Sequence, residues 1–246
     1  SVTAGTVLEG TRMPLRLWFQ AAWYLTNQKH GVSALGLQRV LGLGSYQTAW
    51  AWLHKLRRAM VRPDRERLTG EVEVDETFLG APDEEVDGRA TDRALIAIAA
   101  EVRDRGTGRV RMAKIPDASA PSLIGFIRSS VSEGATIRTD GWSGYVPLPG
   151  YGYQHRPTSL RASKLPAHRV MPRVHRVASL LDRWWLGTYH GGVSMEQLPY
   201  YLDEFTFRFN RRTAKARGLL FYRLLQQAVQ ASPIPYHAIR APDPNG

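Results

Sequence analysis

The sequence predicts an α/β protein in which a mixed β-sheet flanked by helices follows a small helical domain. Strand-like runs of alternating apolar and polar residues, with one helical run among them, occupy residues 71–140. Before them, residues 14–60 carry apolar and aromatic side chains in runs typical of helices. We therefore expect four parts, in chain order: a helical region 1–62, a polar linker 63–70, an α/β domain 71–231 and a tail 232–246.

Composition narrows the class of protein. The chain has 246 residues and is 43% hydrophobic, which is enough to form a sizeable core. It contains no Cys, so disulfides and Cys-based zinc sites are excluded. No apolar run approaches the ~18 residues of a membrane span, and residues 1–4 do not resemble a signal peptide. These features predict a soluble, intracellular protein.

The formal charge of +11 is distributed unevenly along the chain. Residues 1–70 have a net charge of +7, residues 71–150 a net charge of −5, and residues 151–246 a net charge of +9. An acidic middle between two basic segments fits a metal-binding centre with polyanion-binding surfaces on both sides.

Two helices joined by a tight turn are predicted within residues 33–60. Ser33 is placed to cap the first helix, and Gly42 to Gly44 can make the turn. Ser45 or Tyr46 then opens a second helix that runs to about Met60. This arrangement matches helix-turn-helix geometry.

The second of these helices carries polar and basic residues that could contact DNA. Gln47 and Thr48 near its start could touch base edges or phosphates, and Lys55, Arg57 and Arg58 could lie along the backbone. An ordinary helical hairpin with a basic exposed face is the alternative.

An unusually acidic strand is predicted at residues 71–79. Val72 and Val74 alternate with acidic residues, of which Glu73 and Asp75 share a face, whereas Glu76 is expected to point away. Acidic residues disfavour strands, and like charges two positions apart repel each other. A divalent metal ion is the candidate that compensates this charge, and a solvated strand face is the alternative.

The order of the following elements predicts where a second carboxylate lies. A buried strand (94–102), a hairpin partner (109–115), a helix (120–131) and a short strand (135–141) follow in turn. Three strands, a crossover helix and a fourth strand is the opening order of an RNase H-like fold, in which strand four lies beside strand one. Asp75 and Asp140 would then meet on neighbouring strands, although Asp-Gly at 140–141 is also a common turn.

A helix predicted from about Pro172 to Leu186 supplies further candidates. His175, Ser179 and Asp182 fall at i, i+4 and i+7 and therefore share a face. Near the end of a later helix, Arg208, Arg211 and Arg212 could contact phosphates, with a solvated helix end as the alternative.

Several short blocks, in order along the chain, carry a family resemblance. They are Ser1-Val2-Thr3-Ala4-Gly5-Thr6, Gly31-Val32-Ser33-Ala34, Thr48-Ala49-Trp50, Val72-Glu73-Val74-Asp75-Glu76-Thr77, Thr139-Asp140-Gly141, Val174-His175-Arg176, Leu186-Gly187-Thr188-Tyr189-His190-Gly191 and the run from Tyr201 to Arg212. With them the chain resembles, over essentially its whole length, a bacterial insertion-sequence transposase of the DDE type, in the group related to eukaryotic Merlin elements.

The resemblance implies an RNase H-like catalytic core with two Mg²⁺ ions. Asp75 and Asp140 fall on the first two catalytic carboxylates of the family, and the third position, which varies among Glu, Asn and His, falls on His175. A basic residue normally follows about two helical turns later, and here that place holds Asp182 with Arg183 adjacent. Asp182 is therefore the rival third ligand, and Arg183 a further candidate DNA contact.

The expected function is metal-dependent DNA cleavage and strand transfer at the terminal inverted repeats of an insertion sequence. Asp75 would bridge two metal ions, Asp140 would hold one, and neutral His175 would complete the other, which favours Mn²⁺ over Mg²⁺. The implied partners are double-stranded DNA, both terminal repeats and target, and further copies of the chain, in a homodimer or larger assembly. The implied location is the bacterial cytoplasm, associated with the nucleoid.

Two other functions remain open at this point. Relatives tend to carry a Cys-rich zinc ribbon before the Thr-Ala-Gly-Thr block, and this Cys-free sequence begins after that point, as a fragment or truncated copy would. A DNA-end-binding regulator, or an inactive, truncated transposase without nuclease activity, is therefore the first alternative. A structure-selective nuclease on the same fold is the second.

Overall fold

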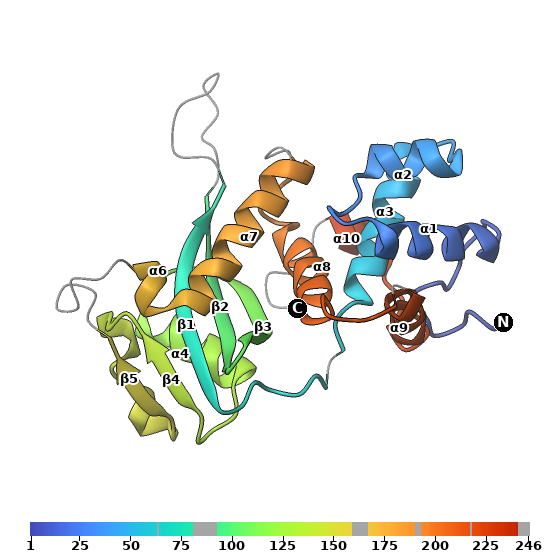
Figure 1. The fold of residues 1–246 in the computed structure, drawn as a ribbon. Coiled ribbons are helices and arrows are strands. Elements are labelled where there is room, and N and C mark those ends of the chain that lie inside the picture. Colours follow the sequence, from blue (N-terminus) through green and yellow to red (C-terminus); the bar gives the residue numbers. More distant parts are fainter. Residues whose placement is uncertain (63, 81–92, 159–166, 190–192, 217, 241–246) are drawn as a thin grey trace. The chain divides into compact units, whose positions relative to one another are not determined.

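A computed structural model describes residues 1–62, 64–80, 93–158, 167–189, 193–216 and 218–240 (Figure 1). The chain forms two compact units. The sheet unit comprises Glu66–Arg183, and the helical unit combines Ser1–Arg65 with Trp184–Gly246. The stretch 81–88, which the sequence predicts to be an acidic loop, lies outside the described residues.

The sheet unit contains a five-stranded mixed sheet in the order β3-β2-β1-β4-β5. The strands are β1 (Glu71–Leu79), β2 (Ala94–Arg103), β3 (Gly106–Ile115), β4 (Thr136–Thr139) and β5 (Gln154–Pro157). β1 and β3 both pair antiparallel with β2, whereas β4 pairs in parallel with β1 and with β5. The prediction that the crossover helix returns the chain to place the fourth strand beside the first is confirmed.

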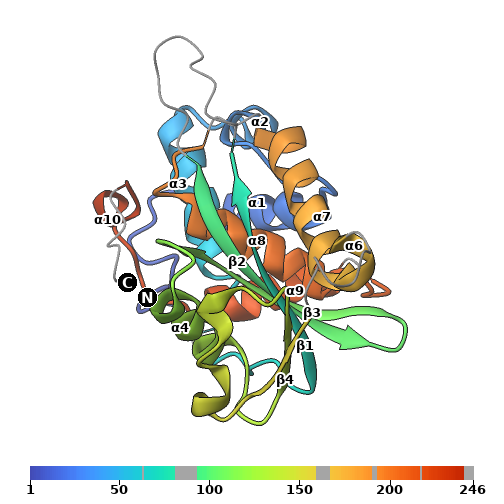
Figure 2. The ribbon, with the colours of Figure 1, turned by 90° about the vertical axis from the view of Figure 1, so that its left-hand side faces the viewer.

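Helices cover both faces of this sheet. α4 (Ala120–Ser130) lies on one face and α7 (Pro172–Tyr189) on the other, as Figures 1 and 2 show. Val72 and Val74 are fully buried in the core that includes α4. Because side chains alternate along a strand, Glu73 and Asp75 point to the face that α7 covers. The period-two pattern of the acidic strand is therefore confirmed.

Shorter helical elements complete the described part of the sheet unit. They are the 3₁₀ helices η1 (Ser143–Tyr145) and η2 (Leu148–Tyr151) and the short helix α6 (Ala167–Val170).

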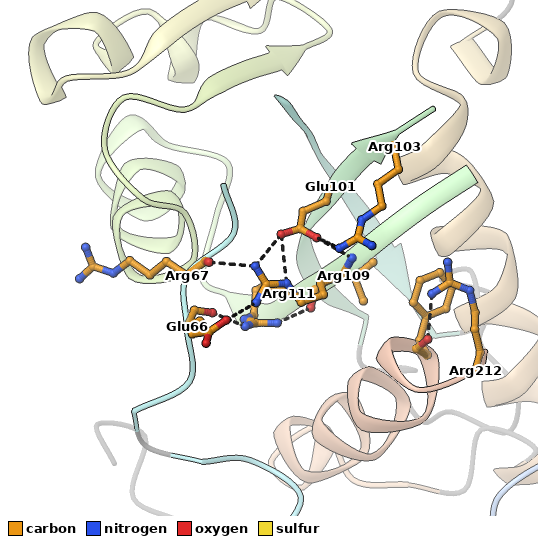
Figure 3. Close-up of polar contacts among 9 residues, drawn as sticks. Glu66, Arg67, Glu101, Arg103, Arg109, Arg111 and Arg212 are labelled. Carbon is orange, nitrogen blue, oxygen red and sulfur yellow. Dashed lines mark hydrogen bonds and ion pairs between the residues drawn. The ribbon is translucent and has the colours of Figure 1, made fainter. Parts of the chain in front are cut away.

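A network of Arg and Glu side chains holds the segment before β1 against the β2–β3 hairpin (Figure 3). Arg109 forms ion pairs with Glu101 (Nη2 to Oε1, 2.8 Å) and with Glu66 (Nη1 to Oε2, 2.9 Å). Arg109 also donates to the carbonyl of Arg67, and Arg111 donates to the carbonyl of Glu66. The end of the predicted linker is thereby fixed to the sheet unit.

The helical unit is built from both ends of the chain. Its helices are α1 (Leu15–Asn27), α2 (Ala34–Leu41), α3 (Tyr46–Arg58), α8 (Leu198–Asn210), α9 (Gly218–Ala228) and α10 (Tyr236–Arg240), with the last residues of α7. Ser33 and Ser45 cap α2 and α3 by accepting from the backbone N–H groups of Gly36 and Thr48, and Gly42 ends α2 with φ +62°. The two capped helices and the glycine turn are confirmed. Among the described residues, no helix is long and apolar enough to cross a membrane.

The structure divides the chain differently from the expected domains, which placed residues 71–231 together. Phe207, Leu224 and Ala228 belong to the same hydrophobic core as α1 and α3. Side chains from α8 and α9 thus share one core with the N-terminal helices. Helix α10 also lies within the stretch 232–246 that was expected to be only a tail.

Candidate active site

Asp75 lies on β1, and Asp140 directly follows the neighbouring strand β4. The last paired position of the parallel strands β1 and β4 joins Glu73 to Arg138. Asp75 lies two residues beyond Glu73, and Asp140 lies two residues beyond Arg138, directly after β4 ends. Since residues two positions apart in extended chain point to the same side, both carboxylates belong to the same region of the sheet.

The surroundings of Asp75 raise its pKa. Burial, followed by the negative charges of Glu76 and Asp140, raises the pKa of Asp75 to about 7. Glu73 adds to the same shift. A neighbouring cation would stabilise the ionised form of a carboxyl group in this position and lower its pKa.

His175, in the first turns of α7, is the imidazole that approaches these carboxylates. Its Nε2 lies 3.7 Å from Oδ2 of Asp75, and the two side chains are 28% and 19% exposed. Asp182, the rival candidate, lies two turns further along α7, and burial raises its pKa. The contact with Asp75 is therefore made by His175.

Glu76 and Tyr145 form a pair that the sequence did not reveal. Glu76 lies on the opposite face from Asp75, as expected, and its Oε2 accepts a hydrogen bond of 2.5 Å from the Tyr145 hydroxyl. Burial raises the pKa of Glu76, and the charge of Asp140 adds to the shift. Glu76 is thus electrostatically part of the acidic cluster. Tyr145 follows Asp140 by five residues in a loop-rich stretch, where no periodic pattern could indicate a partner 69 positions away.

The chemistry of these donors suits a divalent metal ion, although the side chains do not form a closed set of ligands. Carboxylate oxygens and an imidazole nitrogen together bind Mg²⁺, Mn²⁺ or Zn²⁺ in proteins. Asp75 lies among negative groups whose mutual repulsion a divalent ion would relieve. In the described part of the chain, no three His, Asp or Glu side chains are close enough together to hold a metal ion as they stand.

Comparison with known proteins decides the family. The family model of the ISXO2-like transposase domain matches residues 67–210, more than half of the chain. The chain belongs to this transposase family. An uncharacterised protein in the transposable element ISH50 of Halobacterium salinarum is 28% identical over 225 residues, which are 83% of this chain and 72% of that protein. The recognition of an insertion-sequence transposase is thereby confirmed.

A solved structure was also found, that of a pre-cleavage Mos1 transpososome. It is 14% identical, covers 92% of this chain and 82% of its own, and has a TM-score of 0.22. A likeness this low supports no argument about the transposase fold.

Two of the predicted DNA contacts of the transposase are engaged inside the helical unit. Arg57 is 1% exposed, and its Nε donates to Oε2 of Glu204 at 2.8 Å. Arg208 donates to Oε1 of the same Glu204 at 2.8 Å and to the carbonyls of Gln28 and Leu25. Both guanidinium groups compensate a fully buried carboxylate, and the prediction that they contact DNA does not agree with these positions.

The other predicted DNA contacts are accessible to different degrees. Gln47, Arg58, Arg183 and Arg212 are exposed, and Thr48, Lys55 and Arg211 are half-buried. The guanidinium carbons of Arg211 and Arg212 lie 4.1 Å and 4.0 Å from the ring centroids of Phe207 and Phe209. Stacking on an aromatic ring stabilises the position of an Arg side chain. Arg212 stays exposed, whereas burial lowers the pKa of Arg211.

Proposed function

We propose that this transposase cleaves DNA at the ends of its element and joins the ends to target DNA by metal-dependent phosphoryl transfer. One observation carries the proposal. Asp75 lies two residues after Glu73, Asp140 lies two residues after Arg138, and Glu73 and Arg138 are partners in the parallel β1–β4 register. His175 Nε2 lies 3.7 Å from Asp75 Oδ2. The strand order β3-β2-β1-β4-β5 supports an RNase H-like core for this chemistry.

In this proposal, Asp75 and Asp140 bind two divalent ions, and His175 completes one of the two sites. Such ions, when bound, activate water or a DNA 3′-hydroxyl and stabilise the leaving oxygen. Asp75 would help to hold both ions, since its Oδ2 lies 3.7 Å from His175 Nε2 and the charge of Asp140 acts on it, and it must be ionised to do so. His175 must be neutral, because a protonated imidazole cannot donate a lone pair. An imidazole among the ligands favours Mn²⁺ over Mg²⁺.

DNA is the partner that this chemistry requires. The capped helix pair α2–α3 supports a helix-turn-helix role, in which the exposed Gln47 and Arg58 of α3 contact DNA. The basic segments 1–70 and 151–246 add a sequence-independent attraction to phosphates. We extend the proposal to two or more copies on paired ends, because an element has two ends to cleave and join.

The test is incubation of the protein with labelled DNA taken from both flanks of its gene, in Mg²⁺ or Mn²⁺. The wild type is expected to nick the terminal repeats and to join them to a target plasmid, faster in Mn²⁺. Asp75→Asn and Asp140→Asn are expected to bind the same DNA without nicking it. Asp104→Asn, an exposed Asp in the β2–β3 turn, is the matched control and is expected to nick normally.

Three outcomes would contradict parts of the proposal. Binding without nicking by the wild type would favour an end-binding regulator or an inactive copy. Nicking without joining would favour a nuclease. Equal rates in the two ions would argue against His175 as a ligand.

A further inference from the structure

A second pair of charged residues lies directly behind the two acids on the same strands. Glu73 precedes Asp75 by two residues, Arg138 precedes Asp140 by two, and the two are partners in the β1–β4 register. Nη1 of Arg138 lies 3.5 Å from Oε1 of Glu73 and 3.2 Å from Oε1 of Glu71. Arg138 thereby holds Glu73 from the neighbouring strand.

The other oxygen of Glu73 binds the start of α7. Its Oε2 accepts hydrogen bonds from the backbone N–H groups of Arg173 (2.7 Å) and Val174 (3.0 Å). The first N–H groups of a helix have no partner within the helix, and a carboxylate there also interacts favourably with the helix dipole. The usual capping residue adjoins its helix, whereas this one is supplied from a strand 100 residues earlier.

Burial indicates that these bonds matter. Glu73 is fully buried, and a buried carboxylate is unfavourable unless its oxygens are bonded. Its Oε2 accepts from α7, and the charge of its Oε1 is compensated by Arg138 at 3.5 Å without a hydrogen bond. Arg138 also donates to the carbonyl of Val170 at 2.8 Å, at the end of α6. Glu73 and Arg138 therefore connect β1 and β4 with α6 and α7.

His175 is the residue that follows Val174, and Asp75 shares a strand face with Glu73. We propose that Glu73 is a positioning residue, which fixes the start of α7 so that His175 faces Asp75, with Arg138 holding Glu73 in place. The inference rests on the proposed function, because it concerns the metal site that Asp75 and His175 would share. Oε2 of Glu73 is occupied by the two N–H groups of α7, which is the basis for a positioning role.

The test compares Glu73→Ala and Glu73→Gln with Glu71→Gln, which alters a neighbouring Glu of β1 that contacts the same Arg138. Two quantities are measured: amide hydrogen exchange across the chain, and Mn²⁺ affinity from the electron paramagnetic resonance of free Mn²⁺. In Glu73→Ala, exchange at Arg173 and Val174 is expected to quicken about tenfold, as for a lost helix cap. Exchange in β1, β2 and β3 is expected to stay unchanged.

Mn²⁺ affinity is expected to fall by about 10- to 100-fold in Glu73→Ala, the usual effect of losing a residue that orients a ligand. Glu73→Gln keeps a carbonyl oxygen for the two N–H groups and is expected to restore part of both quantities. Glu71→Gln is expected to behave as the wild type. A merely structural role would not link local exchange in α7 to metal affinity.

Three results would overturn the inference. In Glu73→Ala these are unchanged exchange at Arg173 and Val174, equally faster exchange throughout the sheet, and faster exchange at α7 with undiminished Mn²⁺ affinity. A wild-type protein that binds no Mn²⁺ would instead overturn the proposed function, and the positioning role with it.

Discussion

Among single residues, Asp75 has the environment that most strongly indicates a binding site. It lies on a strand covered by α7, with Glu76 and Asp140 raising its pKa beyond the effect of burial. Carboxylates placed this close destabilise the metal-free fold when they ionise. Such destabilisation is expected at a binding site, where a bound ligand relieves the repulsion.

The raised pKa of Asp75 predicts a pH-dependent effect of Asp75→Asn. The pKa is about 7 in the folded protein and near the ordinary 3.8 in the unfolded chain. Between these values the folded state binds more protons, so stability is lost as the pH rises towards 7. Without metal, Asp75→Asn should therefore be more stable than the wild type at pH 8, by on the order of a few kcal/mol.

Urea unfolding at pH 5 and pH 8 in the presence of a chelator measures this difference. The advantage of Asp75→Asn should be smaller at pH 5, and Asp104→Asn should show no such change. An equal difference in the free energy of unfolding at both pH values would mean that ionisation of Asp75 does not destabilise the folded protein.

His175 and Asp182 share a face of α7, and only one of them is expected to matter for catalysis. His175→Ala should reduce Mn²⁺-dependent nicking about tenfold or more, because His175 lies 3.7 Å from Asp75. Asp182→Ala should leave the nicking rate close to that of the wild type. A rate that falls further in Asp182→Ala than in His175→Ala would reverse the assignment.

The sequence could predict Asp75 and Asp140 together because strand order alone brings them to neighbouring strands. The cap that Glu73 provides and the Glu76–Tyr145 pair depend on how a helix and a loop pack on the sheet. Residue types and periodicity do not encode such contacts between distant positions, so these partners appear only in the structure.

At the scale of elements, one buried ion pair ties α3 to α8. Arg57 and Glu204 are both almost inaccessible, and the Arg57 guanidinium also lies 4.0 Å from the ring centroid of Tyr201. Burial alone would raise the pKa of Glu204, but Arg208 and Arg57 outweigh it and lower the pKa. The pair joins a helix of the N-terminal segment to one near the C-terminus.

Arg57→Ala is expected to destabilise the helical unit by about 3–5 kcal/mol, because it leaves a buried carboxylate with one partner fewer. Arg58→Ala, in the exposed neighbour on α3, should change stability by only about 0.5 kcal/mol. Urea unfolding followed by the fluorescence of the buried Trp18 and Trp52 measures both. Equal, small effects would show that Arg57 is not needed for the packing of α3 against α8.

The element boundaries were largely accessible from the sequence, because caps and glycine turns act locally. Ser33, Ser45 and Gly42 lie where the α2 and α3 helix ends require them. The role of Arg57 was not accessible in this way. A basic residue at the end of an amphipathic helix suits a solvated surface equally well, and only its distant partner Glu204 shows otherwise.

At the scale of the whole molecule, the chain is a member of a transposase family with a mixed sheet and two compact units. Its acidic middle segment supplies the site residues Asp75 and Asp140, and its flanking segments are basic. The strand order could be predicted from the succession of three strands, a crossover helix and a fourth strand, whereas the division into units could not. The return of α8 and α9 to the N-terminal core depends on long-range packing that the sequence order conceals.

Anomalous diffraction at the manganese edge, from crystals of the protein grown with Mn²⁺, tests most directly whether Asp75, Asp140 and His175 form a metal site. Anomalous peaks are expected next to Asp75, Asp140 and His175, and are expected to be lost in crystals of Asp75→Asn. A wild-type structure with no peak at these residues, or with Mn²⁺ bound only elsewhere, would contradict the proposed metal site.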